Sequence, residues 1–264
     1  MNAYLTAFQA IAGRELRQFI AQRGRFLSAL VRPLVWLVIF AAGFRAALGV
    51  SIIPPYQTYI TYEVYILPGL CAMVLLFNGM QSSLSLVYDR EMGSMRLLLT
   101  APLPRPWLLF SKLSAGVFVG ALQVYAFLGV AALFGVSLSP EGYLLAIPAI
   151  ILAGFMLGAF GLLISSVIRL IENFATVMNF VIFPMFFLSS ALYPLWRMRE
   201  SSVLLHDICA LNPFTYVVEL IRFSAYGSFA QLPLAVVLGC AVAFFTLSCL
   251  SYSPARTGPG MKSN

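Results

Sequence analysis

Charge is scarce in this sequence. Only 9% of its 264 residues are charged and 61% are hydrophobic, whereas about a quarter of the residues of an ordinary soluble domain are charged. Its mean hydropathy is +0.92. Because a soluble chain of this size must keep a large polar surface, the composition excludes a water-soluble globular protein and predicts a membrane protein.

Histidine and lysine are nearly absent, which excludes two kinds of chemistry. His206 is the only histidine, so the sequence offers no His pair for a metal and no Ser and His site for catalysis. The only lysines are Lys112 and Lys262, and neither follows a glycine as the lysine of a phosphate-binding P-loop does. We therefore expect no enzyme activity and no bound cofactor in this chain.

Cysteine is also rare, with four residues in all. Cys240 and Cys249 would lie roughly 13 Å apart on one helix, which is too far for a disulfide. Residues 1–25 contain no compact apolar core that ends in a small-residue cleavage site. We therefore predict neither a structural disulfide nor a cleaved signal peptide.

Long apolar runs are what the sequence does have, and we predict six membrane-spanning helices in a single domain over residues 1–264. Each run approaches or exceeds the ~20 residues needed to cross the bilayer. Residues 253–264 would form a tail. The predicted spans are 26–44, 64–88, 113–138, 143–168, 173–196 and 232–252.

The positive charges predict the orientation of the chain. An even number of spans places both termini on one side, and twelve of the 16 Lys and Arg residues lie there. The other side holds four, namely Arg45, Arg197, Arg199 and Arg222. Basic residues concentrate on the cytoplasmic side, so both termini are predicted to be cytoplasmic. Topology thus explains the net charge of +7 without a nucleic-acid partner.

Residues 1–25 favour an amphipathic helix in the cytoplasmic interface of the lipid bilayer. Leu5, Phe8, Leu16 and Phe19 fall on one helical face, and most polar residues lie elsewhere. An ordinary positively charged flank is the alternative.

The connection between the second and third spans is charged and yet half apolar. Met92, Met95, Leu98 and Leu99 follow a helical spacing, and prolines from Pro102 onward end the pattern. This spacing predicts a short amphipathic helix in the cytosol. It either docks into a partner or rests on the lipid headgroups.

The segment between the fifth and sixth spans is too long for a simple turn. Asn212 followed by Pro213 is typical of a helix start, so we predict a helix from Phe214 to about Tyr226. Glu219 and Arg222 could pair across one turn of it. A helix this short cannot span a membrane, so the segment is predicted to be a re-entrant or interfacial hairpin on the outer side.

Few ionisable residues fall inside the predicted spans. Glu63, Arg169 and Glu172 lie at span ends and are expected to be interfacial anchors. Carriers of ions usually bind charge deep within their helices, so the sequence favours an amphiphilic or lipid-linked substrate, or a closed path between the helices, over an ion pore.

In their order and placement, these features resemble the permease subunits of bacterial type-two ABC exporters, which include polysaccharide, nodulation-factor and drug-export permeases. The motifs that carry the resemblance are residues 88–96 with Ala101-Pro102, residues 187–194, and residues 212–216 with Glu219 and Arg222. Residues 95–105 and 122–127 also resemble a permease subgroup associated with quinoprotein alcohol oxidation.

The resemblance implies specific partners and sites. It implies two permease copies that are identical chains and form a homodimer in the bacterial cytoplasmic (inner) membrane. It also implies two copies of a separate ATP-binding subunit that holds ATP and Mg. The residues implied for coupling to that subunit are Glu91, Met92, Met95, Arg96, Leu98 and Leu99. Those implied for the outer gate and hairpin are Ser189, Ser190, Tyr193, Pro194, Asn212, Pro213, Tyr216, Glu219 and Arg222.

Two other functions stay open from the residues alone. The chain could be an ion-coupled secondary transporter, or a scaffold that anchors other proteins without transporting anything. A neighbouring gene that encodes a GxxxxGK[ST] protein would favour the exporter.

Overall fold

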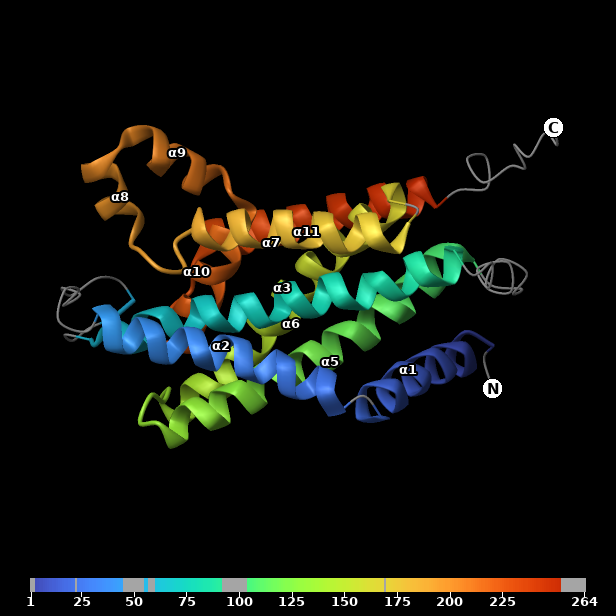
Figure 1. The fold of residues 1–264 in the computed structure, drawn as a ribbon, viewed down its shortest axis with the longest axis horizontal. Helices are drawn as coiled ribbons and strands as arrows, with labels where there is room; N and C mark the ends of the chain where they lie inside the picture. Colours follow the sequence, from blue (N-terminus) through green and yellow to red (C-terminus); the bar gives the residue numbers. More distant parts are fainter. Residues whose placement is uncertain are drawn as a thin grey trace.

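The computed structural model describes residues 3–21, 23–44, 55–56, 60–91, 104–168 and 170–252. Every regular element in them is an α-helix, which confirms the predicted all-α membrane fold (Figure 1). The helices are α1 (Ala3–Ala21), α2 (Arg23–Phe44), α3 (Tyr62–Glu91), α5 (Arg105–Leu133), α6 (Pro140–Val167), α7 (Ile171–Phe187), α8 (Leu195–Ser201), α9 (Val203–Leu211), α10 (Pro213–Ala225) and α11 (Gln231–Ser251).

Helix α3 forms the centre of the bundle. It packs against α2, α5, α6, α7 and α10, while α6 also contacts α11. The side chains of Leu70, Leu76 and Met80 on α3 are fully buried, as are Phe127 of α5 and Leu157 of α6. The helices on the two sides of α3 are therefore positioned relative to one another by their packing against it.

Small residues let the central helices approach closely. A Cβ atom on Gly79 of α3 would lie 3.0 Å from the backbone nitrogen of Gly158, and one on Gly161 would lie 2.8 Å from the carbonyl oxygen of Gly79. Gly116 and Gly120 of α5 face Ser82 and Asn78 of α3 in the same way. These glycines thus lie at the contacts between α3, α5 and α6 and permit the close packing there.

Four helices of the described residues are long and apolar enough to cross a membrane: α3 over Tyr62–Tyr88, α5, α6 and α11. A fifth is added if α9 and α10, which are bent by 76° at a short break, count as one broken span. Predicted spans 26–44 and 173–196 correspond to α2 and α7. The 17 residues of α7 extend for about 26 Å, which is less than the ~30 Å hydrocarbon core. The count of six spans stays a prediction.

The first turns of α1 and the last turn of α11 lie at one end of the bundle, and α8, α9 and α10 lie at the other (Figure 1). Trp107 Nε1 donates to the Tyr4 carbonyl at 3.1 Å, and Arg105 Nη1 donates to the Tyr252 carbonyl at 3.4 Å. Helix α1 also packs along α5, where Glu15 lies 3.8 Å from Lys112. The segments that flank residues 92–103 are therefore far from the outer hairpin predicted from the sequence.

Candidate functional site

The chain leaves helical geometry after Phe187 and does not resume it until Leu195, although the predicted span continued to Trp196. Pro184 lies inside α7 and Pro194 directly precedes α8. Within the break, the Ser189 hydroxyl donates to the Phe186 carbonyl at 2.6 Å. We define residues 188–194 as the break; Ser189, Ser190, Ala191 and Leu192 within it are buried.

The start of α3 holds the break from one side. Tyr62 donates its hydroxyl proton to the Leu192 carbonyl at 3.0 Å, and Tyr65 donates to the Ser190 carbonyl at 3.1 Å. One turn further on, a Cβ atom on Gly69 would lie 2.8 Å from the Cβ and carbonyl oxygen of Ala191. Buried backbone carbonyls need donors when they are outside a helix, and α3 supplies two of them.

Asn212 holds the break from the other side, at the start of α10. Its Oδ1 accepts from the backbone nitrogen of Phe214 at 3.0 Å, which is the predicted N-cap contact. Its Nδ2 donates to the carbonyls of Met185 at 2.8 Å and Leu188 at 2.6 Å. One amide thus begins α10 and also binds the last turn of α7.

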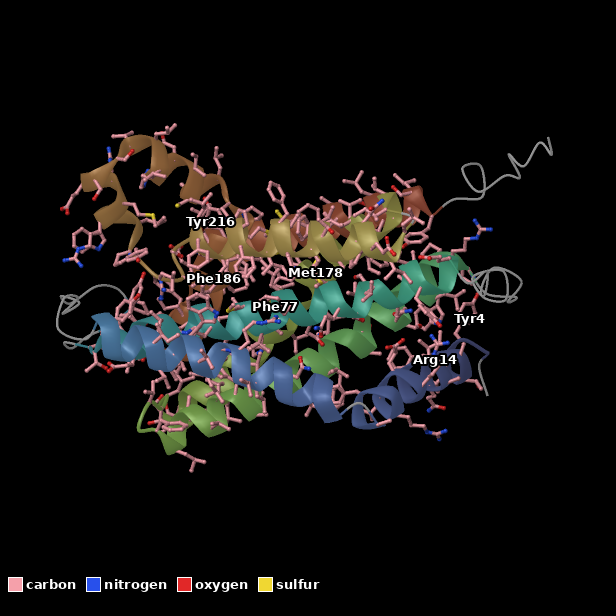
Figure 2. The ribbon with its side chains drawn as sticks, viewed as in Figure 1. Tyr4, Arg14, Phe77, Met178, Phe186 and Tyr216 are labelled. Atoms are coloured by element: carbon pink, nitrogen blue, oxygen red, sulfur yellow. The ribbon has the colours of Figure 1, made fainter. Side chains whose placement is uncertain are left out.

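The next residues of α10 continue this contact. Thr215 Oγ1 donates to the Cys209 carbonyl at 2.7 Å and accepts from the Ser190 nitrogen at 3.4 Å. Ser190 Oγ donates to the Thr215 carbonyl at 3.4 Å. The rings of Phe186 and Phe214 meet edge to face at 6.3 Å, and Phe186 and Tyr216 are labelled at this end of the bundle in Figure 2.

Arg222 joins the break, α3 and α10. Its side chain is buried, with 4% of the residue exposed, and its Nη2 donates to the Ser190 carbonyl at 2.9 Å. Its guanidinium carbon also lies 4.2 Å from the centre of the Tyr65 ring. Such a cation–π contact helps to stabilise a guanidinium that has been removed from water.

Two further tyrosines complete the aromatic surroundings of Arg222. The rings of Tyr56 and Tyr226 meet at 4.6 Å, and those of Tyr56 and Tyr65 are 6.5 Å apart. Burial raises the pKa of Tyr56 above its ordinary value, while the charge of Arg222 acts in the opposite direction. The Tyr56 phenol therefore stays neutral near neutral pH.

The structure brings together the predicted residues Ser189, Ser190, Asn212 and Arg222. Within the described part of the chain, no ion pair within 4.0 Å links Glu219 to Arg222, and Arg222 points to the break instead. The remaining predicted residues shape or pack this region: Pro194 precedes α8, Pro213 is the first residue of α10, and Tyr193 and Tyr216 pack against the core.

Sequence reasoning missed Tyr56, Tyr62 and Tyr65, and it gave no role to Thr215 within the motif 212–216. A signal was present, because Tyr56, Tyr59, Tyr62 and Tyr65 recur every third residue before the second predicted span. Tyrosines at a span end are usually interfacial anchors, and their donor role becomes visible only when the break is placed beside them.

Only one of the predicted coupling residues is described, and it lies at the opposite end of the bundle from this site. Glu91 ends α3, and its Oε2 accepts from the backbone nitrogen of Ile171 at 3.0 Å. Met92, Met95, Arg96, Leu98 and Leu99 lie outside the described residues.

One face of α7 is both polar and exposed. Its first half presents Asn173, Thr176 and Asn179, and its second half presents Phe180, of which 78% is exposed, and Phe183. At 100° per residue these positions fall within about one third of the helix circumference. Asparagine side chains are costly in contact with lipid tails, so this face would be unfavourable in the hydrocarbon core.

The bundle and its buried break describe an α-helical membrane protein with a broken helix at one end. Residues 6–226 match the ABC-2 type transporter family, and the chain belongs to that family. It is thus an integral membrane protein of the permease class, as the sequence motifs indicated.

Three curated relatives support this assignment. A "Putative transport permease ycf38" from Cyanophora paradoxa is 29% identical over 215 residues, which cover 78% of this chain and 71% of the relative. A protein of the same description from Porphyra purpurea is 28% identical over 218 residues, covering 81% and 72%. "Nodulation protein J" from Rhizobium leguminosarum bv. viciae is 23% identical over 222 residues, covering 80% of each chain.

Proposed function

We propose that this chain is the membrane-spanning subunit of an ATP-driven exporter in the bacterial inner membrane. It would move a hydrophobic or amphiphilic substrate out of the cytoplasm or the inner leaflet. The observation that carries the proposal is the family match over residues 6–226. Since the printed sequence has no P-loop lysine, a separate ATP-binding subunit in two copies would supply the energy and hold ATP and Mg.

The segment from Glu91 to Leu99 is the proposed contact with that subunit. Its apolar residues recur at helical spacing, with Arg96 among them. The helices that flank it, α3 and α5, both pack in the centre of the bundle. A displacement of this segment would therefore move two helices of the core. A nucleotide can drive such a change only if the partner binds it differently in the two states.

A second copy of the chain is the proposed covering of the exposed face of α7. Asn173, Thr176 and Asn179 would face that copy or the substrate instead of lipid. Phe180 and Phe183 would provide an apolar wall nearer to the outer end. A face with amide groups in one half and aromatic rings in the other suits a substrate that is amphiphilic.

The break and the hairpin α8–α10 are the proposed outer gate. The buried contacts of Ser190, Asn212 and Arg222 fix the gate to α3 and α7, so that a shift of either helix would move the hairpin.

Co-purification of the tagged chain from its native membrane in mild detergent tests the proposal. We expect a P-loop ATPase to co-purify and to show vanadate-sensitive turnover. Arg96→Glu should abolish both, whereas Arg199→Glu, the same charge reversal on the exposed α8, should leave the co-purification unchanged.

Other outcomes identify the other functions. Transport that survives ATP depletion and fails without an ion gradient would show a secondary transporter, and a chain that transports nothing would be a scaffold. A wild-type rate of ATP turnover in Arg96→Glu would show that the docking segment has been assigned wrongly.

A further inference from the structure

The first turn of α7 is capped by a carboxylate from another helix. Leu170 occupies the N-cap position and has no side-chain group that can accept a hydrogen bond. Glu91, which precedes Ile171 by 80 residues, accepts from the Ile171 nitrogen instead. The first backbone N–H groups of a helix lack internal partners and carry partial positive charge, so a carboxylate is a suitable acceptor there.

The other end of α7 is also held by a side chain from outside the helix. The last carbonyls of a helix have no internal donors, and Asn212 donates to those of Met185 and Leu188. Helix α7 is therefore bound to the end of α3 at one terminus and to the start of α10 at the other.

Helix α7 has few other attachments. Among the described helices it packs chiefly against α3, through buried residues such as Phe174 and Ile182. Helix α3, in contrast, is surrounded by five helices. Because a packed core resists displacement, a shift of α7 along α3 would disturb fewer contacts than a shift of α3 itself.

We infer that Glu91 is a positioning residue that links the proposed coupling segment to α7, and that α7 carries the displacement to the break at residues 188–194. The inference rests on the proposed function, because it assumes that a partner subunit moves residues 92–99. Glu91 would thus connect the coupling segment to α7, whereas the chain itself connects that segment only to α3 and α5.

Although the proposed contact with the ATP-binding subunit begins at Glu91, the inference assigns Glu91 itself to Ile171 and leaves residues 92–99 to that subunit. Substitutions separate the two roles. Glu91→Ala removes the acceptor for Ile171. Glu91→Gln keeps an oxygen that can accept the same hydrogen bond but loses the charge. Leu170→Asp added to Glu91→Ala gives α7 a cap of its own without restoring its link to α3.

The experiment uses the complex purified with its ATP-binding partner in lipid nanodiscs. A cysteine replaces Ala175, which is exposed on α7 and is not one of the residues that form its polar and aromatic face, and serines replace the half-buried Cys240 and Cys249. The readout is the rate of maleimide labelling at position 175 without nucleotide and with ATP plus vanadate. A change in this rate on vanadate trapping reports a displacement of α7.

We expect Glu91→Ala to keep the partner bound and to reduce the vanadate-dependent change about fivefold, the population shift that corresponds to the loss of one cap. Glu91→Gln should keep most of the change. Leu170→Asp should fail to restore it in the Glu91→Ala background, because a helix that is capped but unlinked still lacks its connection to α3.

Four results would overturn the inference. Loss of the partner in both Glu91 variants would place Glu91 on the ATP-binding subunit and leave the proposed function intact. An unchanged vanadate-dependent change in labelling rate in Glu91→Ala would show that the hydrogen bond between Glu91 and Ile171 does not transmit the displacement. If Leu170→Asp restored the vanadate-dependent change in the Glu91→Ala background, Glu91 would act only as the N-terminal cap of α7. A wild-type chain that purifies without any ATPase would remove both the inference and the proposed function.

Discussion

Arg222 and the carbonyl of Ser190 are joined by a hydrogen bond of 2.9 Å, although 32 residues separate them in the chain. The same carbonyl accepts from Tyr65 at 3.1 Å. A carbonyl oxygen has two lone pairs and can serve two donors. One backbone oxygen therefore binds the break to both α3 and α10.

This shared acceptor predicts that Tyr65→Phe and Arg222→Met are not additive. Either donor alone can satisfy the Ser190 carbonyl, whereas loss of both leaves it buried without a donor. The double variant should therefore lose about 1–2 kcal/mol of unfolding free energy beyond the sum of the single losses. Unfolding in detergent measures this coupling.

Tyr62→Phe is the matched control, because Tyr62 donates to a different carbonyl, that of Leu192. Its effect should add to that of Arg222→Met within about 0.5 kcal/mol. Equal coupling energies in the two cycles would contradict the role of Ser190 as the shared acceptor.

Gly69→Ala should destabilise the protein, because its methyl group would be only 2.8 Å from Ala191 of the break. We expect a cost of about 1–3 kcal/mol, the usual range for an overpacked site. Gly129→Ala is the control, since nothing lies within 4 Å of a Cβ atom there, and alanine should stabilise α5 by up to about 1 kcal/mol. Thermal unfolding of the two variants should move in opposite directions.

Local signals in the sequence predicted much of the hairpin. Asn212 and Pro213 marked the start of α10 because a cap and a proline act within one turn. The end of α7 was not predicted, since residues 173–196 are apolar almost throughout. Ser189 and Ser190 raise polarity only slightly, and their hydroxyls bond to nearby carbonyls inside the fold.

The partners of the predicted residues could not be obtained from spacing. The family resemblance implied that Glu91 contacts another subunit, and within this chain its carboxylate accepts from Ile171, 80 residues away. Arg222 could have paired with Glu219 on its own helix, and it donates to the Ser190 carbonyl instead. Such contacts depend on which helices become neighbours, and one sequence contains no direct record of that.

Asn212 has two separable roles, and substitutions should divide them. Asn212→Ser keeps an N-cap acceptor but loses the donors to Met185 and Leu188. Asn212→Asp also keeps the cap, and it places a carboxylate beside those two carbonyls. We expect Asn212→Asp to cost about 1–3 kcal/mol and to be the more destabilising of the two. If both variants had the unfolding free energy of the unsubstituted chain, the contact of Asn212 with α7 would contribute nothing to stability.

The exposed polar face of α7 predicts where two copies of the chain meet. Asn179 is exposed in the middle of α7, where contact with lipid tails would be unfavourable. A cysteine at position 179, in a chain with serines at positions 240 and 249, should therefore form cross-linked dimers with a short bis-maleimide in native membranes. A cysteine at Val242 of α11 is the control, because Val242 is 57% exposed and an apolar residue can face lipid at no such cost. Efficient cross-linking at 242 and none at 179 would place the second copy on α11 and leave the amides of α7 to face a different partner.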